Sequence, residues 1–166
     1  PLVREHVRMG GRALVLEQGM NGHMITIYEN SANIQLMWTH LIPATIDGKA
    51  MHNVQNAMFA AAICHSMGKS LEDIRQGLRT FATSYFQAPG RLNVFEEHPF
   101  KVILDYGHNP AAMEAMTKLC TQLEPKGRRI ICFSMPGDRR DEDIVAAATI
   151  VAGKFDHYIC KADDGR

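Results

Sequence analysis

The sequence has little of what membrane proteins and nucleic-acid-binding proteins need. No apolar run reaches the roughly 20 residues of a membrane-spanning helix, and no signal peptide opens the chain. Lys plus Arg equals Asp plus Glu at 18 each, so no net charge attracts nucleic acid or an anionic membrane. Aromatic residues make up only 7% of the chain, and no basic run is interleaved with them. We therefore expect a globular protein with neither nucleic acid nor membrane as a partner.

The sequence also lacks closely spaced cysteines. The four cysteines stand singly in apolar segments, and none forms the C-x-x-C pair that metal sites favour: Cys64, Cys120, Cys132 and Cys160. This pattern predicts reduced cysteines in the core of a cytoplasmic protein, and it predicts no metal ligands.

Common catalytic motifs are missing as well. The chain contains no G-x-S-x-G, H-E-x-x-H or G-x-G-x-x-G. Gly68-Lys69-Ser70 imitates the end of a phosphate-binding P-loop, but Ile63 stands where the first glycine is required, and a helical pattern precedes it instead of a strand. We therefore reject a P-loop here and assign no catalytic residue.

The first half of the chain predicts three strands followed by a helical hairpin. The strands are expected at 13–18, 23–29 and 34–38, with a turn at Gly19, Asn21 and Gly22. Alternation in the second strand predicts a half-exposed face that carries Thr26 and Tyr28. The helix expected at 53–67 is apolar on nearly all sides, which is typical of a buried helix. Ser70 and Asp73 then resemble a capping box at the start of a second helix, which ends near residue 81.

The second half predicts an α/β domain. Residues 82–90 lose periodicity and are expected to be an interdomain linker. Asn109 is a good N-cap, and Pro110 suits the first position of a helix. Strands alternating with helices predict βαβ units and a parallel sheet, with elements at 92–96, 101–105, 110–123, 129–134, 141–152 and 156–161.

Polar residues gather at the ends of the predicted parallel strands. The loops at 105–110, 135–143 and 161–166 should lie on one edge of the sheet, where open α/β sheets bind ligands, although each loop alone could be an ordinary solvated connection. Asn53 and Asn56 lie one helical turn apart and could contact the edge of an adenine ring, unless Asn53 only caps its helix. Arg91, after Pro89-Gly90, could reach a phosphate or could be a surface ion-pair partner.

Several short segments stand out in order along the chain: HNVQN at 52–56, SLEDIRQGL at 70–78, PGRLNVFE at 89–96, DYGHNP at 105–110, GDRRDED at 137–143 and DDGR at 163–166. Together they resemble the Mur ligase superfamily of ATP-dependent amide ligases. The resemblance implies that residues 1–86 close a central ATP-binding domain made of strands and a helical hairpin. Residues 87–166 would form a truncated Rossmann-like C-terminal domain.

The resemblance also implies roles for individual residues. Asn53 and Asn56 would contact adenine, with His52 as a weaker candidate, Arg91 would contact the phosphates and Asp105 the ribose. His108 and Asn109 would line the same cleft between the two domains. The incoming amino acid would be bound by Asp138, Arg139, Asp163, Asp164 and Arg166.

The implied reaction is ATP-dependent formation of an amide bond through an acyl phosphate. Three longer stretches most resemble the sequences of the members that join arginine to aspartate side chains of a polymer. These stretches are FQAPGRLNVFE, VILDYGHNPAAM and SMPGDRRDEDI. Alternatives are ligases of the peptidoglycan-precursor or folylpolyglutamate type, or a nucleotide-binding module without catalysis. Because the chain opens on Pro1, we expect a fragment whose P-loop and Mg²⁺ ligands lie upstream, which is inactive alone and whose parent is a homo-oligomer.

Overall fold

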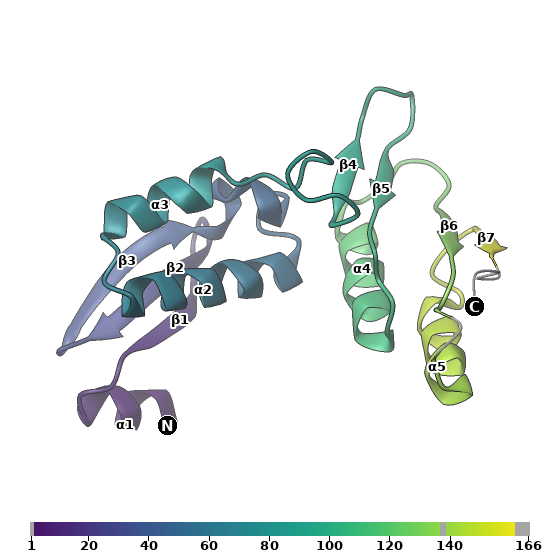
Figure 1. The fold of residues 1–166 in the computed structure, drawn as a ribbon. Helices are drawn as coiled ribbons and strands as arrows, with labels where there is room; N and C mark the ends of the chain where they lie inside the picture. Colours follow the sequence, from purple (N-terminus) through teal and green to yellow (C-terminus); the bar gives the residue numbers. More distant parts are fainter. Residues whose placement is uncertain (1, 137–138, 162–166) are drawn as a thin grey trace. The chain divides into compact units, whose positions relative to one another are not determined.

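The computed structural model describes residues 2–136 and 139–161, and the chain forms two compact units, Pro1–Ile103 and Leu104–Arg166 (Figure 1). Four of the predicted amino-acid-binding residues lie outside the described residues: Asp138, Asp163, Asp164 and Arg166. The domain boundary predicted between residues 86 and 87 stays a prediction.

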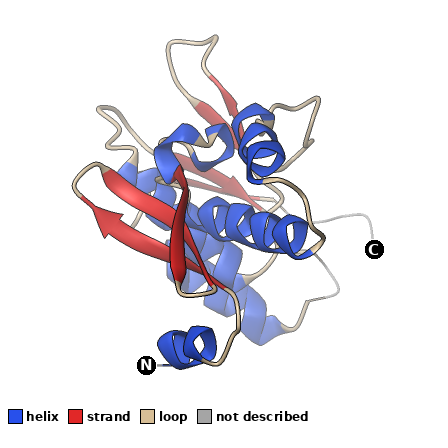
Figure 2. Cartoon of the chain, turned by 90° about the vertical axis from the view of Figure 1, so that its left-hand side faces the viewer, coloured by secondary structure: helices blue, strands red, loops and turns tan. Residues whose placement is uncertain are grey.

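The first unit contains an antiparallel sheet of three strands. A short helix that the sequence did not predict, α1 (Leu2–Arg8), precedes the strands β1 (Ala13–Gly19), β2 (Gly22–Glu29) and β3 (Ala32–Trp38). The sheet order is β1-β2-β3, and the β1–β2 hairpin turns at the predicted position (Figure 2). Gly22 has φ +107°, a value that glycine adopts far more readily than other residues.

The half-exposed face predicted for β2 is wrong at Thr26. This residue is 1% exposed, and its hydroxyl donates a hydrogen bond to the Glu17 carboxylate on β1. The Tyr28 hydroxyl donates to the same carboxylate. A polar side chain is buried at low cost when it is hydrogen-bonded, so alternation of apolar and polar residues did not report exposure here.

The predicted helical hairpin is present, and its two helices cover one side of the sheet (Figure 1). Two 3-10 turns, η1 (Thr39–Leu41) and η2 (Pro43–Thr45), lead into α2 (Met51–Ser66), which is followed by α3 (Leu71–Thr80). The predicted cap is confirmed, because the Asp73 N–H donates to Ser70 Oγ at 3.1 Å. The core of this unit joins strand and helix residues: Ile25, Ile27, Leu36, Met37, Ile42, Ala44, Ala61 and Ile74.

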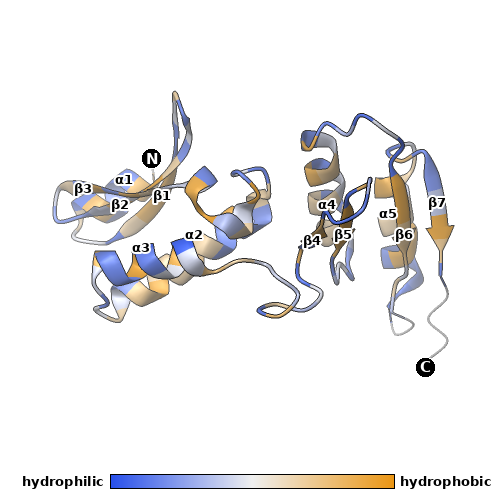
Figure 3. Ribbon diagram, turned by 90° about the horizontal axis from the view of Figure 1, so that it is seen from above, coloured by the Kyte–Doolittle hydropathy of each residue, from blue (hydrophilic) through white to orange (hydrophobic). Residues whose placement is uncertain are grey.

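The prediction that the first of these helices is buried is wrong. Within α2 only Val54 and Ala61 are buried, whereas Phe59 is 68% exposed and Ile63 is 59% exposed. The helix is apolar over much of its surface, but its partners lie along one side only (Figure 3). An all-round apolar pattern therefore left open which side would be covered.

The remaining strands form two pairs. β4 (Asn93–Phe95) hydrogen-bonds to β5 (Val102–Leu104), and β6 (Ile130–Phe133) runs parallel to β7 (His157–Cys160). The β6-α5-β7 unit, with α5 (Asp141–Val151), confirms the predicted βαβ pattern. The expectation that the 101–105 strand joins this parallel sheet is wrong for the described residues. A short connection joins β4 to β5, so these consecutive strands pair locally.

The helices of the second unit pack on each other through small and apolar residues. α4 (Pro110–Gln122) and α5 contribute Met113, Ala147 and Val151 to a buried cluster. Cys132 and Cys160 are exposed rather than in the core, which corrects the cysteine prediction for these two, and all four thiols are free. Among the described residues, no helix has the length and apolar character needed to cross a membrane.

Candidate functional site

The two asparagines predicted to contact adenine form a short relay of amides in the first unit. The Asn53 Nδ2 donates to the carbonyl oxygen of Ala44 at 2.7 Å, and Asn56 Nδ2 donates to Asn53 Oδ1 at 3.2 Å. Asn53 is half-buried and Asn56 is exposed. The relay thus fixes Asn53 and leaves the exposed amide of Asn56 able to offer both a donor and an acceptor.

The alternative role for Asn53, as the cap of its helix, is wrong. α2 begins at Met51 and its N-cap position is Ala50, so Asn53 lies inside the first turn. Its side chain instead holds the helix to the turn η2 through Ala44. This contact fixes the adenine candidate without using it as a cap.

Arg91 lies on a sharply bent segment of the first unit. The residues on either side of it have a left-handed backbone, with φ +70° at Gly90 and φ +52° at Leu92. Leu92 and Asn93 are each 1% exposed, whereas Arg91 itself is exposed. The segment therefore buries Leu92 and Asn93 and leaves Arg91 exposed.

Asn93 is a residue that the sequence reasoning missed. Its side chain donates to the carbonyl oxygens of Thr83 at 2.8 Å and Ala88 at 2.9 Å, and it accepts from the N–H of Gly90 at 2.7 Å. Two signals in the sequence pointed to it: Asn93 is a polar residue inside the strand predicted at 92–96, and it lies in the same motif as Arg91.

In the second unit, the loop after β5 carries the ribose candidate and ends in the predicted cap. Asn109 Oδ1 accepts from the N–H of Ala112 at 2.8 Å, and Pro110 opens α4, so both capping predictions are confirmed. The His108 ring lies against Tyr106, with their centroids 5.3 Å apart. Capping occupies one acceptor position of the Asn109 oxygen, so its NH2 group is the part of the side chain that this bond leaves for a ligand.

Gly107 makes the close packing of this loop possible. A Cβ at this position would lie 3.1 Å from the terminal methyl of Met113 and 3.3 Å from Oδ1 of Asp105. With a Cβ here, the Met113 methyl and the Asp105 carboxylate would have to shift by a few tenths of an ångström. The glycine therefore leaves a gap the size of a Cβ beside Asp105.

The amino-acid-binding candidates are represented by Arg139 alone within the described residues. Arg139 is exposed, and its N–H donates to the carbonyl oxygen of Pro136 at 3.1 Å. The neighbouring Arg140 forms two hydrogen bonds of 3.1 Å with the Asp143 carboxylate at the start of α5. This ion pair raises the pKa of Arg140 above its usual value.

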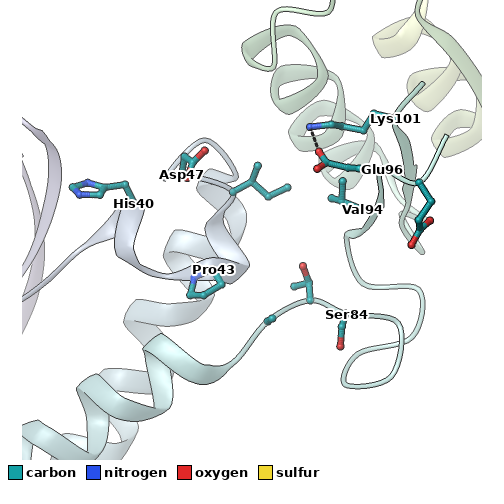
Figure 4. Close-up of a pocket in the computed structure, with 11 residues that line it drawn as sticks. His40, Pro43, Asp47, Ser84, Val94, Glu96 and Lys101 are labelled. Atoms are coloured by element: carbon teal, nitrogen blue, oxygen red, sulfur yellow. Dashed lines mark ion pairs between the residues drawn. The ribbon is translucent and has the colours of Figure 1, made fainter. Parts of the chain in front are cut away.

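A cavity of about 710 Å³ lies in the first unit, apart from the nucleotide candidates. It is lined by His40, Asp47, Ser84, Glu96, Glu97 and Lys101, among others, and the Lys101 ammonium pairs with the Glu96 carboxylate at 2.5 Å (Figure 4). None of the six predicted nucleotide-contacting residues lines it. Over residues 2–136 and 139–161, no three His, Cys, Asp or Glu side chains cluster as a metal site would require.

Comparison with known proteins places these residues in a family. Residues 90–166 match the family model described as Mur ligase, glutamate ligase domain. A cyanophycin synthetase of Crocosphaera subtropica is 36% identical over 99% of this chain, and one of Synechocystis sp. is 37% identical over all of it. Residues 90–166 thus carry a Mur ligase domain, and the chain as a whole is similar to cyanophycin synthetases.

The likeness extends more weakly to a second kind of Mur ligase. The UDP-N-acetylmuramoyl-L-alanyl-D-glutamate–2,6-diaminopimelate ligase of Chlamydia trachomatis is 37% identical, but over only 53% of this chain. The chain spans 18% of the length of each of these relatives. The α/β fold that the sequence predicted is confirmed, whereas the roles of the individual site residues stay predictions.

Proposed function

We propose that this chain is part of an ATP-dependent acid–amino-acid ligase of the cyanophycin synthetase type. The observation that supports this proposal is the similarity to cyanophycin synthetases, which are 36–38% identical to the chain over 98–100% of its length. That span includes the stretches that hold the nucleotide and amino-acid candidates. The proposed reaction joins arginine to the side-chain carboxylate of aspartate in a polymer.

The proposed chemistry passes through an acyl phosphate. The terminal phosphoryl group of ATP is transferred to the substrate carboxylate, and ADP is released. The amine of the incoming amino acid then attacks the acyl carbon, and phosphate leaves as the amide bond forms. Such a transfer depends on positioning and on neutralising charge more than on covalent help from the protein.

Within this scheme, the described residues bind and orient the nucleotide. We assign adenine recognition to the exposed amide of Asn56, held by Asn53, and phosphate contact to Arg91. In the second unit we assign the ribose hydroxyls to Asp105, beside the gap at Gly107. These donor and acceptor types fit an adenine nucleotide, because carboxylates accept hydroxyl hydrogens and a guanidinium pairs with phosphate.

Mg²⁺ is the cofactor that the family implies, and it would neutralise charge on the phosphates when bound. The described residues include no cluster suited to hold it, so no step is assigned to the metal here. Arg139, together with Asp138, Asp163, Asp164 and Arg166, is proposed to contact the amino acid. Acidic residues would suit a guanidinium, which pairs bidentately with carboxylates.

A chimera tests the activity. Replacing the matching segment of the Synechocystis relative with these 166 residues should preserve ADP release that requires arginine and the aspartate polymer. The same chimera with Asp105→Ala is the matched control, and it should need a higher ATP concentration for the same rate of ADP release. ADP release with diaminopimelate instead of arginine would favour the second kind of ligase, which the 37% identity to the Chlamydia enzyme over half of the chain supports.

Nucleotide binding by the 166-residue chain is the companion test, because it does not depend on the chimera folding. Calorimetric titration with ADP should show binding that Arg91→Ala and Asp105→Ala each weaken. Each substitution removes a charge-assisted contact worth about 1.5–3 kcal/mol, which corresponds to a loss of roughly tenfold or more in affinity. Unchanged ADP affinity in both variants would contradict the assignments.

A further inference from the structure

We propose that Asn93 is a positioning residue that fixes the backbone turn carrying Arg91 and thereby sets the affinity for the nucleotide's phosphates. The proposal rests on the phosphate role of Arg91 given above. Asn93 is not offered as a contact to the nucleotide itself. It would act through the conformation of residues 83–91.

Both N–H donors and the oxygen of the Asn93 side chain form hydrogen bonds within this turn. A carboxamide has two N–H donors and one acceptor oxygen. Both donors are used, on Thr83 O and Ala88 O, and the oxygen accepts from the Gly90 N–H at 2.7 Å. With 1% exposure, Asn93 makes these bonds away from competing water. The three bonds tie the start, middle and end of the turn to one buried point.

A strained neighbour holds the other side of Arg91. Leu92 has φ +52°, and its side chain is 1% exposed. A left-handed backbone is unfavourable for leucine and persists only where the surroundings impose it; such residues concentrate at functional sites. The burial of Leu92 and the hydrogen bonds of Asn93 together impose the left-handed backbone conformation on Leu92. The backbone of Arg91 is thus fixed on both sides while its side chain stays exposed.

The fixed turn should preorganise Arg91 for binding a phosphate. If Asn93 is removed, the turn opens and Arg91 must be ordered again each time a phosphate binds. Ordering one long side chain and its backbone weakens binding by roughly fivefold on general grounds. The effect should appear only with ligands that carry phosphates.

The experiment compares ADP with adenosine on the 166-residue chain. Asn93→Ala and Gly90→Ala should each weaken ADP binding roughly fivefold, the second by straining the turn at φ +70° while Asn93 itself is retained. Both variants should leave adenosine binding unchanged. The matched control is Ile74→Val, in the core of the same unit, which lowers stability and should alter neither affinity.

A double-mutant cycle separates this proposal from the role of Arg91. In the Arg91→Ala background, Asn93→Ala should have no further effect on ADP affinity. The proposal would be overturned if the effects of Arg91→Ala and Asn93→Ala on ADP affinity add in full. It would also be overturned if Asn93→Ala leaves ADP affinity unchanged, or if it weakens adenosine binding as much as ADP binding. If Asn93→Ala does not fold, Gly90→Ala decides by the same criteria.

Amide hydrogen exchange supplies a readout that needs no nucleotide. The Gly90 N–H should be protected in the wild-type chain and exchange rapidly in Asn93→Ala, whereas Ile74→Val should leave it protected. Protection in Asn93→Ala would overturn the positioning role. If exchange behaves as expected but Arg91→Ala leaves ADP affinity unchanged, the phosphate role of Arg91 fails, and with it the use proposed for the turn.

Discussion

Glu17 on β1 should stabilise the sheet only while its carboxylate is ionised. The carboxylate accepts hydrogen bonds from Thr26 and from Tyr28, and these bonds lower the pKa of Glu17 below its usual value of 4.5. A carboxyl group whose pKa is lowered on folding stabilises the folded state at pH values above the unfolded pKa. That stabilisation is lost as the pH falls through the folded pKa.

Glu17→Gln keeps the size of the side chain but removes its charge. Hydrogen bonds to a charged group contribute about 1.5–3 kcal/mol, and neutral ones contribute about 1 kcal/mol. The bond from the buried Thr26 hydroxyl counts most, because the Tyr28 hydroxyl is only partly shielded from water. We therefore expect the variant to lose about 1.5 kcal/mol of unfolding free energy at pH 7.

The assay is urea unfolding followed by tryptophan fluorescence. Trp38 is the only tryptophan of the chain and ends β3, so its emission reports on the sheet that contains Glu17. The loss should lower the urea midpoint by roughly 1 M at pH 7 and shrink toward zero as the pH falls below 4.5. Glu5→Gln, at a site with 63% side-chain exposure, should change the midpoint little. An equal gap at pH 7 and pH 3 would refute the reasoning.

Three further substitutions test other parts of the chain. Ser70→Ala should cost about 1 kcal/mol of unfolding free energy in a urea titration, because the N–H of Asp73 loses its cap. Thr117→Val should raise the thermal midpoint, since the Thr117 hydroxyl is buried in α4 without a partner and its removal recovers about 1 kcal/mol. Gly107→Ala should weaken ADP binding in calorimetry by pressing on Asp105; unchanged affinity would show that the gap is not needed.

Local signals in the sequence predicted local structure well. Capping residues such as Ser70 and Asn109 act within one helical turn, and the structure places both as predicted. The predicted strands of the first sheet agree with the structure because their turns and apolar positions are equally local. These signals need no knowledge of distant parts of the chain.

Long-range partners were beyond the sequence reasoning. The burial of Thr26 depends on Glu17 across the sheet, and the pairing of β5 depends on which strand it meets. The apolar surface of α2 did not reveal that only one side would be covered. At the candidate site, Arg91 and Asn93 lie in the same motif, but the role of Asn93 depends on bonds to residues up to ten positions away, which the motif does not reveal.

The connection between strands has a consequence for the order of folding. In the β1-β2-β3 sheet, neighbouring strands are joined by turns of a few residues, so each pairing closes a short loop. The parallel pair β6 and β7 requires a longer closure, secured by a bond from the Arg129 N–H to the Asp156 carboxylate across 27 residues. Because closing long loops slows folding, the antiparallel sheet should form before β6 and β7 pair.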